Sequence, residues 1–404
     1  MHQPLEGIRI LEWGTFHAGP GANAILGDLG AEIIKIEQPK SGDPMREQWR
    51  YGEAVFDLPD GRNLFFEAAN RNKKGIVLDL KQEKGREIAY RLVTKSDVFL
   101  TNFRQNVIEK MGMTYQILSQ LKPQLIYASI TAYGSRGPDS HRGGFDPQGQ
   151  ARSGIMFASG EPDMPPLLLH FGIIDQVTSI TTSQAIITSL LMRERFGIGQ
   201  KIDVSILGSA LYLQYINVLN ATWGKRSIPR HKRSETDPLR NHYRCKDDKW
   251  ICIGFPQYWE HMWPQLCEAL GHPELHSDPR FNTRDMRFEN SVELISVFDN
   301  IFASKLRDEW LDIFAPYDFI FVPVNTAMEL ENDPQVIQNN YIVDFNDPSI
   351  GKLKIPGFPV EFSQTFAKTR SLGPSLGEHT TEVLRSLGEY SEEEINQFEQ
   401  EGVI

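Results

Sequence analysis

Short apolar runs alternate with longer segments of mixed polarity over the first half of the 404-residue chain. The runs have the length and the isoleucine, valine and leucine content of buried strands. They occupy residues 8–13, 31–37, 75–80, 96–101 and 125–131. Helical patterns lie between them, most clearly in residues 22–29 and 82–93. Strands that alternate with helices favour a parallel sheet covered by helices, so we predict an α/β fold that is Rossmann-like over residues 1–150.

A long, almost uncharged segment follows, and after it comes a second set of elements. Residues 175–196 have the length and composition of a single helix. The basic, proline-punctuated residues 224–238 are typical of a linker, and residues 243–255 predict a hairpin around Asp247 and Asp248. The domain limits that we expect are a large Rossmann-like domain in 1–215, a linker in 216–240, a small α/β domain in 241–318, and a linker and tail in 319–404.

The composition is that of an ordinary globular protein, with 40% apolar and 24% charged residues. Its 42 Lys and Arg against 53 Asp and Glu give a net charge of −11, which opposes binding to nucleic acid or to an anionic membrane surface. Residues 176–192 are uncharged but contain nine Ser, Thr and Gln residues, so we expect no membrane span. The first residues lack the features of a secretory signal, and we expect a cytoplasmic protein. His272 and His276 have the i, i+4 spacing of metal ligands on a helix, but no third ligand or HExxH pattern accompanies them, so we predict no metal site.

A glycine pattern follows the first predicted strand. Gly19, Gly21 and Ala24 fit a dinucleotide-binding fingerprint, with Glu37 at the end of the next strand as the acid that would contact a ribose. Against this interpretation, the loop before the first glycine is long and Pro20 lies between the glycines. An NAD-binding oxidoreductase and a glycine-rich helix entry both remain open at this stage.

Basic and amide side chains follow the ends of the predicted strands. Lys81 comes after residues 75–80, and Asn102, Arg104 and Lys110 come after residues 96–101. In an open parallel sheet the ligand crevice lies outside the carboxyl ends of the strands. These residues either bind a phosphorylated ligand or form a solvated charged rim.

Asp175 begins the long uncharged helix, directly after the apolar run 167–174. One interpretation is structural, because Asp is a favoured N-cap residue that accepts hydrogen bonds from the first N–H groups of a helix. The other is chemical: the carboxylate is a nucleophile, and the same N–H groups stabilise charge that develops on a reacting carbonyl. The residues alone leave both interpretations open.

Several longer motifs, taken in order, resemble those of CoA-transferase family III, the family of formyl-CoA:oxalate and carnitine CoA-transferases. They are PLEGIRILE, AGPGANAILGDLGAEIIKIEQPKSGDPMR, NRNKKGIVLDLK, DVFLTNF, VPVNTAMELENDPQV and LGEHTTEVLRSLG. The resemblance implies an intertwined dimer, in which each chain has a Rossmann-like large domain, a smaller α/β domain and long linkers. It also implies that the tail in 319–404 returns to the large domain.

The same resemblance implies the activity and its residues. Asp175 would be the nucleophile that moves CoA from an acyl-CoA to a free carboxylic acid, through an aspartyl anhydride and an aspartyl-CoA thioester. Coenzyme A would be carried as a thioester substrate, with no permanently bound cofactor. The positions implied to contact CoA are Thr15, Phe16, His17, Ala18, Gln38, Leu78, Lys81, Asn102, Phe103 and Lys110. Those implied to line the substrate pocket are Phe145 and Asp146.

Related branches give alternatives that the resemblance leaves open. A 2-methylacyl-CoA racemase needs a histidine where this chain has Phe145, which argues against that branch. In some members two paralogous chains pair, so the chain is expected to form a homodimer or a heterodimer in which it supplies Asp175. Only Gly254 stands where formyl-CoA transferases have a glycine run, which argues against a formyl or oxalate substrate. Phe145, Phe157 and Phe171 favour a larger acid, such as an aryl-substituted dicarboxylate with succinyl-CoA as donor.

Overall fold

The chain divides into two compact units in its computed structural model, which describes all residues except 1, 48–49, 52–53, 59, 171 and 257–259. Unit 1 comprises Met1–Phe157, Leu168–Ser227 and Asn340–Ile404, and unit 2 comprises Ala158–Leu167 and Ile228–Asn339. Each unit is treated by itself below. The domain limits expected from the sequence stay a prediction.

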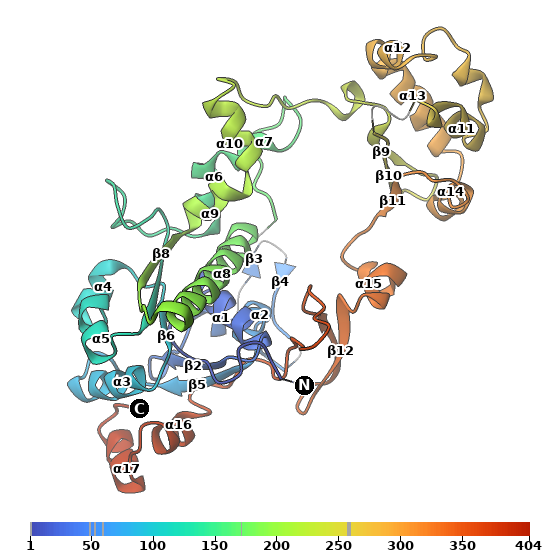
Figure 1. Ribbon diagram of the computed structural model, residues 1–404. Coiled ribbons are helices and arrows are strands. Elements are labelled where there is room, and N and C mark those ends of the chain that lie inside the picture. Colours follow the sequence, from blue (N-terminus) through green and yellow to red (C-terminus); the bar gives the residue numbers. More distant parts are fainter. Residues whose placement is uncertain (1, 48–49, 52–53, 59, 171, 257–259) are drawn as a thin grey trace. The chain divides into compact units, whose positions relative to one another are not determined.

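A parallel sheet forms the centre of unit 1 (Figure 1). Its strands in the described chain are β1 (Arg9–Trp13), β2 (Glu32–Glu37), β5 (Lys73–Val77), β6 (Val98–Thr101), β7 (Ile126–Thr131) and β8 (Lys201–Ser205). They lie in the order β5-β2-β1-β6-β7-β8, and every neighbouring pair is parallel. Numbered along the chain this is the order 3-2-1-4-5-6 of a doubly wound Rossmann sheet. The predicted α/β fold is confirmed.

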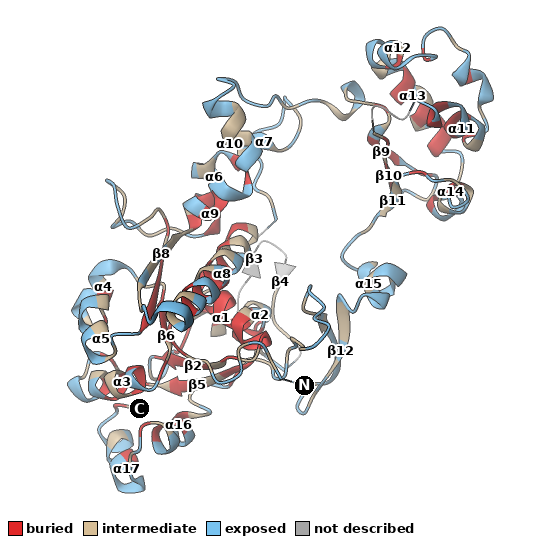
Figure 2. Ribbon diagram, viewed as in Figure 1, coloured by how far each residue is buried: buried red, intermediate tan, exposed pale blue. Residues whose placement is uncertain are grey.

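Helices cover both faces of this sheet. They are α1 (Ala18–Asp28), α3 (Glu83–Thr94), α5 (Tyr115–Leu121), α8 (Ile173–Phe196), α16 (Thr380–Ser386) and α17 (Glu392–Gln400). Leu11 of β1 shares one apolar cluster with α3, α5 and residues of α16 and α17, including Leu384. The neighbouring Ile10 faces the other side and packs with α1 and α8. Buried residues, red in Figure 2, accordingly concentrate in the strands and in α1.

Close packing of α1 against α8 explains why the long helix is almost uncharged. A Cβ atom added to Gly21 of α1 would lie only 2.6 Å from Ser179 Oγ of α8, so only glycine fits there. Other buried side chains of α8 are also small and uncharged, including Thr178, Thr182 and Ser183. No helix in the described part of the chain combines the length and apolar character that crossing a bilayer requires.

Unit 1 also contains shorter elements around this core. They are η1 (Pro44–Arg46), β3 (Arg50–Tyr51), β4 (Ala54–Val55), α2 (Leu64–Asn70), α4 (Gln105–Lys110), α6 (Asp146–Ser153), α7 (Ile155–Ala158), α9 (Ile206–Leu213), α10 (Tyr215–Thr222), β12 (Ile342–Asp347) and β13 (Gly351–Pro356). Strands β12 and β13 pair as an antiparallel hairpin.

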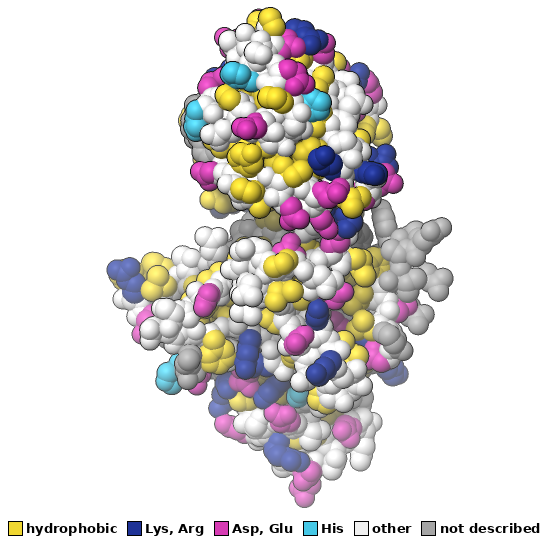
Figure 3. Space-filling model, turned by 90° about the vertical axis from the view of Figure 1, so that its right-hand side faces the viewer, with side chains coloured by type: hydrophobic (Ala, Val, Ile, Leu, Met, Phe, Trp, Pro, Cys, Tyr) yellow, Lys and Arg dark blue, Asp and Glu magenta, His cyan; other side chains and the backbone are white. Residues whose placement is uncertain are grey.

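Unit 2 is built on a small antiparallel sheet in the order β11-β10-β9. Its elements are η2 (Arg233–Glu235), β9 (Arg240–Arg244), β10 (Trp250–Gly254), α11 (Met262–Ala269), η3 (Pro273–His276), α12 (Arg284–Glu289), α13 (Ser291–Phe302), α14 (Arg307–Phe314), β11 (Phe321–Val324), η4 (Leu330–Asn332) and α15 (Pro334–Gln338). The predicted hairpin is confirmed: β9 pairs with β10, and Asp248 in the turn has φ 63°. On the face drawn in Figure 3, acidic and basic side chains are interspersed.

Candidate active site

A cavity of about 450 Å³ lies in unit 1 at the carboxyl ends of β1, β2, β6 and β7. The strand order reverses between β1 and β6, and a doubly wound sheet binds its ligands at that point. The sequence-predicted residues that line the cavity are Thr15, Phe16, Ala18, Gln38, Leu78, Lys81, Asn102, Phe103, Phe145 and Asp175. His17, Lys110 and Asp146 are not among the lining residues.

The loop after β1 forms one wall, and Asn102 holds it in place. The Asn102 side chain accepts a hydrogen bond from Thr15 N at 2.9 Å and donates one to Thr15 O at 2.7 Å. A Cβ atom at Gly14 would lie 3.0 Å from Asn102 Oδ1, so the glycine permits this close approach. The carbonyl oxygen and the nitrogen of the Asn102 amide are thus both engaged in positioning the loop. Behind the loop, the rings of Trp13 and Phe103 lie 4.3 Å apart.

The Asp175 carboxylate lies in this cavity, on the first turn of α8. Within the described residues it makes no hydrogen bond or ion pair. Burial raises the pKa of Asp175 to about 7, and the nearby Asp146 carboxylate adds to the rise. A carboxylate with these surroundings is more basic than usual and is free to react.

Asp146 lies outside the cavity, where it caps α8. Its Oδ2 accepts hydrogen bonds from Ile174 N at 2.7 Å and Asp175 N at 3.2 Å, and its Oδ1 accepts one from Gln150 Nε2 at 2.6 Å. Gln176 N donates to Gly172 O. The N–H groups that the sequence suggested for stabilising a reacting carbonyl are therefore already occupied, and that part of the expectation is wrong. Asp175 itself does not cap α8, because the capping carboxylate is that of Asp146.

His17 and Lys110 lie beside the cavity without lining it. His17 Nε2 is 2.8 Å from Gln176 Oε1, so His17 contacts the residue next to Asp175. Burial lowers the pKa of His17, which keeps the imidazole neutral at pH 7. Lys110 is an exposed residue at the end of α4. Of the other aromatic candidates, Phe157 is 68% exposed, and Phe171 lies outside the described residues.

Basic side chains at the cavity give an acidic protein a local site for anions. Lys81, Arg104 and Arg142 all line it. Arg142 comes from the loop after β7 and was not among the predicted site residues. The rule that selected Lys81 and Asn102, namely position after a strand end, also applies to this loop and would have found Arg142.

The dinucleotide fingerprint is not formed. Gly19 and Gly21 lie inside α1, where they serve close packing rather than a phosphate loop. Glu37 accepts two hydrogen bonds from Arg46, each at 2.7 Å, and a third from Asp43 N. The acid that would contact a ribose is fully engaged within the protein.

These features and the sequence as a whole place the chain in CoA-transferase family III, whose profile matches residues 5–380. It is therefore an enzyme of a family that acts on acyl-CoA. It is 32% identical to the succinyl-CoA:glutarate CoA-transferase of Mus musculus over 402 residues, which cover 100% of this chain and 90% of the relative. It is 31% identical to the succinyl-CoA–D-citramalate CoA-transferase of Chloroflexus aurantiacus, with coverage of 100% and 98%. The crystal structure of a CAIB/BAIF family protein from Brucella suis is 30% identical, with a TM-score of 0.86 and coverage of 96% and 100%.

Proposed function

We propose that the chain transfers CoA from an acyl-CoA thioester to a free carboxylic acid, with Asp175 as the covalent nucleophile. The observation that carries this proposal is the Asp175 carboxylate, which has no hydrogen-bond or ion-pair partner among the described residues and lies in a cavity at the switch point of a Rossmann-like sheet. Its raised pKa makes the ionised carboxylate a stronger nucleophile than an exposed one. Above pH 7 most of it is ionised and ready to attack.

In the proposed cycle, Asp175 attacks the thioester carbonyl and the carbon–sulfur bond breaks, which leaves a mixed anhydride and a CoA thiolate. The thiolate attacks the aspartyl carbonyl, releases the donor acid and forms an aspartyl-CoA thioester. The acceptor carboxylate attacks this thioester to give a second anhydride and the thiolate again. The thiolate then attacks the acceptor's carbonyl, which yields the new acyl-CoA and regenerates Asp175. One thioester replaces another, so the cycle needs no ATP.

The cavity walls have distinct parts in this proposal. The anhydride is sensitive to water, and the rings of Trp13, Phe16 and Phe103 supply apolar surface that excludes it. Lys81 and Arg104 would hold the phosphates of CoA, since both are exposed cations at the rim. Coenzyme A enters and leaves as a thioester rather than as a permanent cofactor.

The experiment that tests the nucleophile is incubation with succinyl-CoA, followed by peptide mass spectrometry. We expect CoA attached to the peptide that contains Asp175. Asp175→Asn should lose the adduct, whereas Asp163→Asn, a matched change at a side chain that is 84% exposed, should keep it. An adduct that survives in Asp175→Asn, or no adduct from any of a panel of acyl-CoAs, would overturn the assignment.

For the substrates, we propose succinyl-CoA as donor and a small carboxylic acid as acceptor. The support is that the two relatives are both named as CoA-transferases that use succinyl-CoA. Phe16 and Phe145 stand edge to face at the cavity with ring centroids 5.1 Å apart, which favours an acceptor with an apolar or aryl group. Comparing glutarate with phenylsuccinate as acceptors checks this, and a strong preference for glutarate would refute the aryl preference.

We also propose that the chain works as a dimer, with itself or with a paralogous chain. Large apolar side chains are exposed on α8 to α10 of unit 1, among them Ile180, Leu191, Tyr212 and Ile216. Exposed apolar surface of this kind marks interfaces between proteins. Light scattering after size exclusion should give twice the chain mass, and Ile216→Glu should reduce it. A monomer at micromolar concentration would refute the homodimer.

A further inference from the structure

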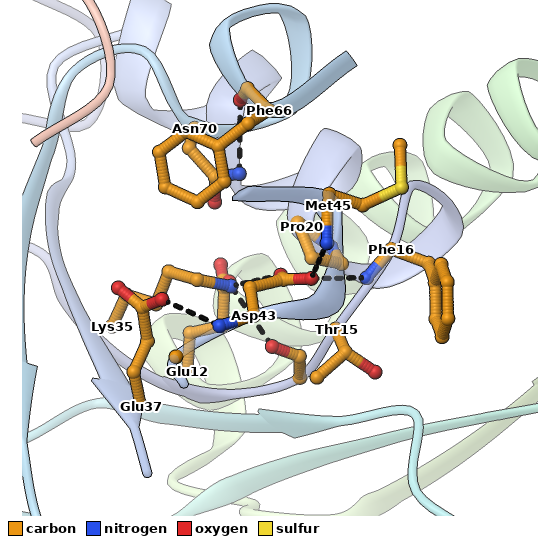
Figure 4. Close-up of polar contacts among 12 residues, drawn as sticks. Glu12, Thr15, Phe16, Pro20, Lys35, Glu37, Asp43, Met45, Phe66 and Asn70 are labelled. Carbon is orange, nitrogen blue, oxygen red and sulfur yellow. Dashed lines mark hydrogen bonds and ion pairs between the residues drawn. The ribbon is translucent and has the colours of Figure 1, made fainter. Parts of the chain in front are cut away.

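Four charged side chains lie buried together beneath the loop that follows β1 (Figure 4). They are Glu12, Lys35, Asp43 and Lys73, and each is at most 3% exposed. Lys35 Nζ donates to Glu12 Oε1 at 3.0 Å, to Asp43 Oδ2 at 2.9 Å and to Gly14 O at 2.9 Å. All three protons of this ammonium group are therefore used.

Such a cluster is not explained by stability. Removing a charge from water costs on the order of several kcal/mol, and apolar residues often serve as well at such positions. Burial alone would lower the pKa of Lys35, but the Asp43 and Glu12 carboxylates outweigh burial and raise it, so Lys35 stays charged. A buried charge that is maintained in this way is available to orient its neighbours.

The neighbour that it orients is the backbone of Phe16. Asp43 Oδ1 accepts hydrogen bonds from Phe16 N at 3.2 Å and from Met45 N at 3.0 Å. Phe16 has φ 61°, in the left-handed region that residues other than glycine rarely adopt, at a cost of about 1 kcal/mol or more. Side chains hold the three loop residues one after another: Lys35 binds Gly14, Asn102 binds Thr15, and Asp43 binds Phe16, which maintains this strained turn.

The strained turn aims the Phe16 ring at the cavity. The ring lines the cavity and meets Phe145, the residue that directly precedes the Asp146 cap of α8. The Lys35–Asp43 pair is thus connected through Phe16 to the wall beside the nucleophile.

We propose that Lys35 and Asp43 are positioning residues, which hold Phe16 in its left-handed conformation so that its ring forms the surface on which the CoA arm binds. The proposal rests on the proposed function in taking this cavity as the CoA site. It adds that the binding surface is set by an ion pair that is itself shielded from solvent. Lys35 does not line the cavity, whereas Asp43 lies in its wall but is only 1% exposed.

The test is the dissociation constant for free CoA, measured by calorimetry on variants shown to be folded, because this equilibrium involves no covalent step at Asp175. Asp43→Asn and Phe16→Ala should each weaken binding about tenfold, and the double variant should be no weaker than either single variant. Asp28→Asn is the matched control. Asp28 is also buried and ion-paired, 2.6 Å from Arg71, but it does not line the cavity, so it should keep wild-type affinity.

Wild-type affinity in Asp43→Asn, independent losses in the double variant, or no CoA binding by the wild type would overturn the proposal. If Asp43→Asn does not fold, Phe16→Ala is the remaining test. Wild-type CoA affinity in Phe16→Ala would show that the Phe16 ring is not a binding surface for CoA, and this would overturn the proposal. Failure of the proposed nucleophile would appear separately, as retained transfer in Asp175→Asn, while the CoA affinities of the wild type, Asp43→Asn and Phe16→Ala stay as expected.

Discussion

Asp175→Asn is expected to stabilise the fold at alkaline pH although it removes the proposed nucleophile. The pKa of Asp175 rises from 3.8 to about 7 on folding, because the carboxylate is buried and lies near Asp146. The unfolded chain therefore loses this proton at lower pH than the folded chain. As the pH rises from about 4 to 7 the ionised form increasingly favours unfolding, and above 7 the effect is constant.

The size of the effect follows from the two pKa values. A tenfold change in an acid constant corresponds to about 1.4 kcal/mol, so the ionised Asp175 destabilises the fold by up to about 4 kcal/mol at pH 8 and by about 2 kcal/mol at pH 5. Asparagine has nearly the same shape and no charge to bury, so it removes this cost.

The assay is urea-induced unfolding of wild type and Asp175→Asn at pH 5 and pH 8. The variant should gain more at pH 8 than at pH 5, and the difference between the two gains should be about 2 to 3 kcal/mol. The exposed control Asp163→Asn should show no such pH dependence. Equal gains in unfolding free energy at both pH values, or no gain at pH 8, would show that folding does not raise the pKa of Asp175.

Three further changes test the site and its supports. Asp146→Asn removes the like charge beside Asp175, so the pKa of Asp175 should fall, and the loss of CoA-adduct formation on acidification should occur at lower pH than in the wild type. An unchanged pH profile would contradict an electrostatic interaction between Asp146 and Asp175. Gly21→Ala places a methyl group 2.6 Å from Ser179 Oγ and should cost about 1 to 3 kcal/mol in urea unfolding. Ser179→Ala should restore part of that loss, and simple additivity would argue against direct contact. Asn102→Ala frees the loop after β1 and should weaken CoA binding several-fold by calorimetry, with wild-type affinity as the contrary result.

The fold could be predicted from the sequence because buried parallel strands appear as uninterrupted apolar runs. The runs in 31–37 and 125–131 match β2 and β7 to within one residue. The strand predicted in 75–80 differs from β5, which is Lys73–Val77. The apolar run extends past the strand because Leu78 and Leu80, in the loop after β5, are buried in the core. Apolar character reports burial, and in this loop burial extends beyond the hydrogen-bonded strand.

The site was harder to predict, because position along the chain does not reveal where a polar group points. Asn102 does lie at a strand end, as predicted, but the sequence does not show that its amide oxygen and nitrogen both bind the backbone of Thr15. Lys35 lies in the middle of an apolar run, and its partners Glu12 and Asp43 are 23 and 8 residues away. Only the folded sheet brings these charges together.

The route of the chain through unit 1 also constrains how the protein is made. Leu384, Ile395 and Val403 complete the same apolar cluster that contains Leu11, although all of residues 228–339 belong to the other unit. During synthesis one face of the Rossmann sheet therefore stays incompletely covered until nearly 400 residues have left the ribosome. The segment 228–339 is continuous and can collapse earlier. In C-terminally truncated chains, unit 1 should thus be the part that aggregates and requires chaperones. Fragments that end after residue 339 should still contain a folded unit 2.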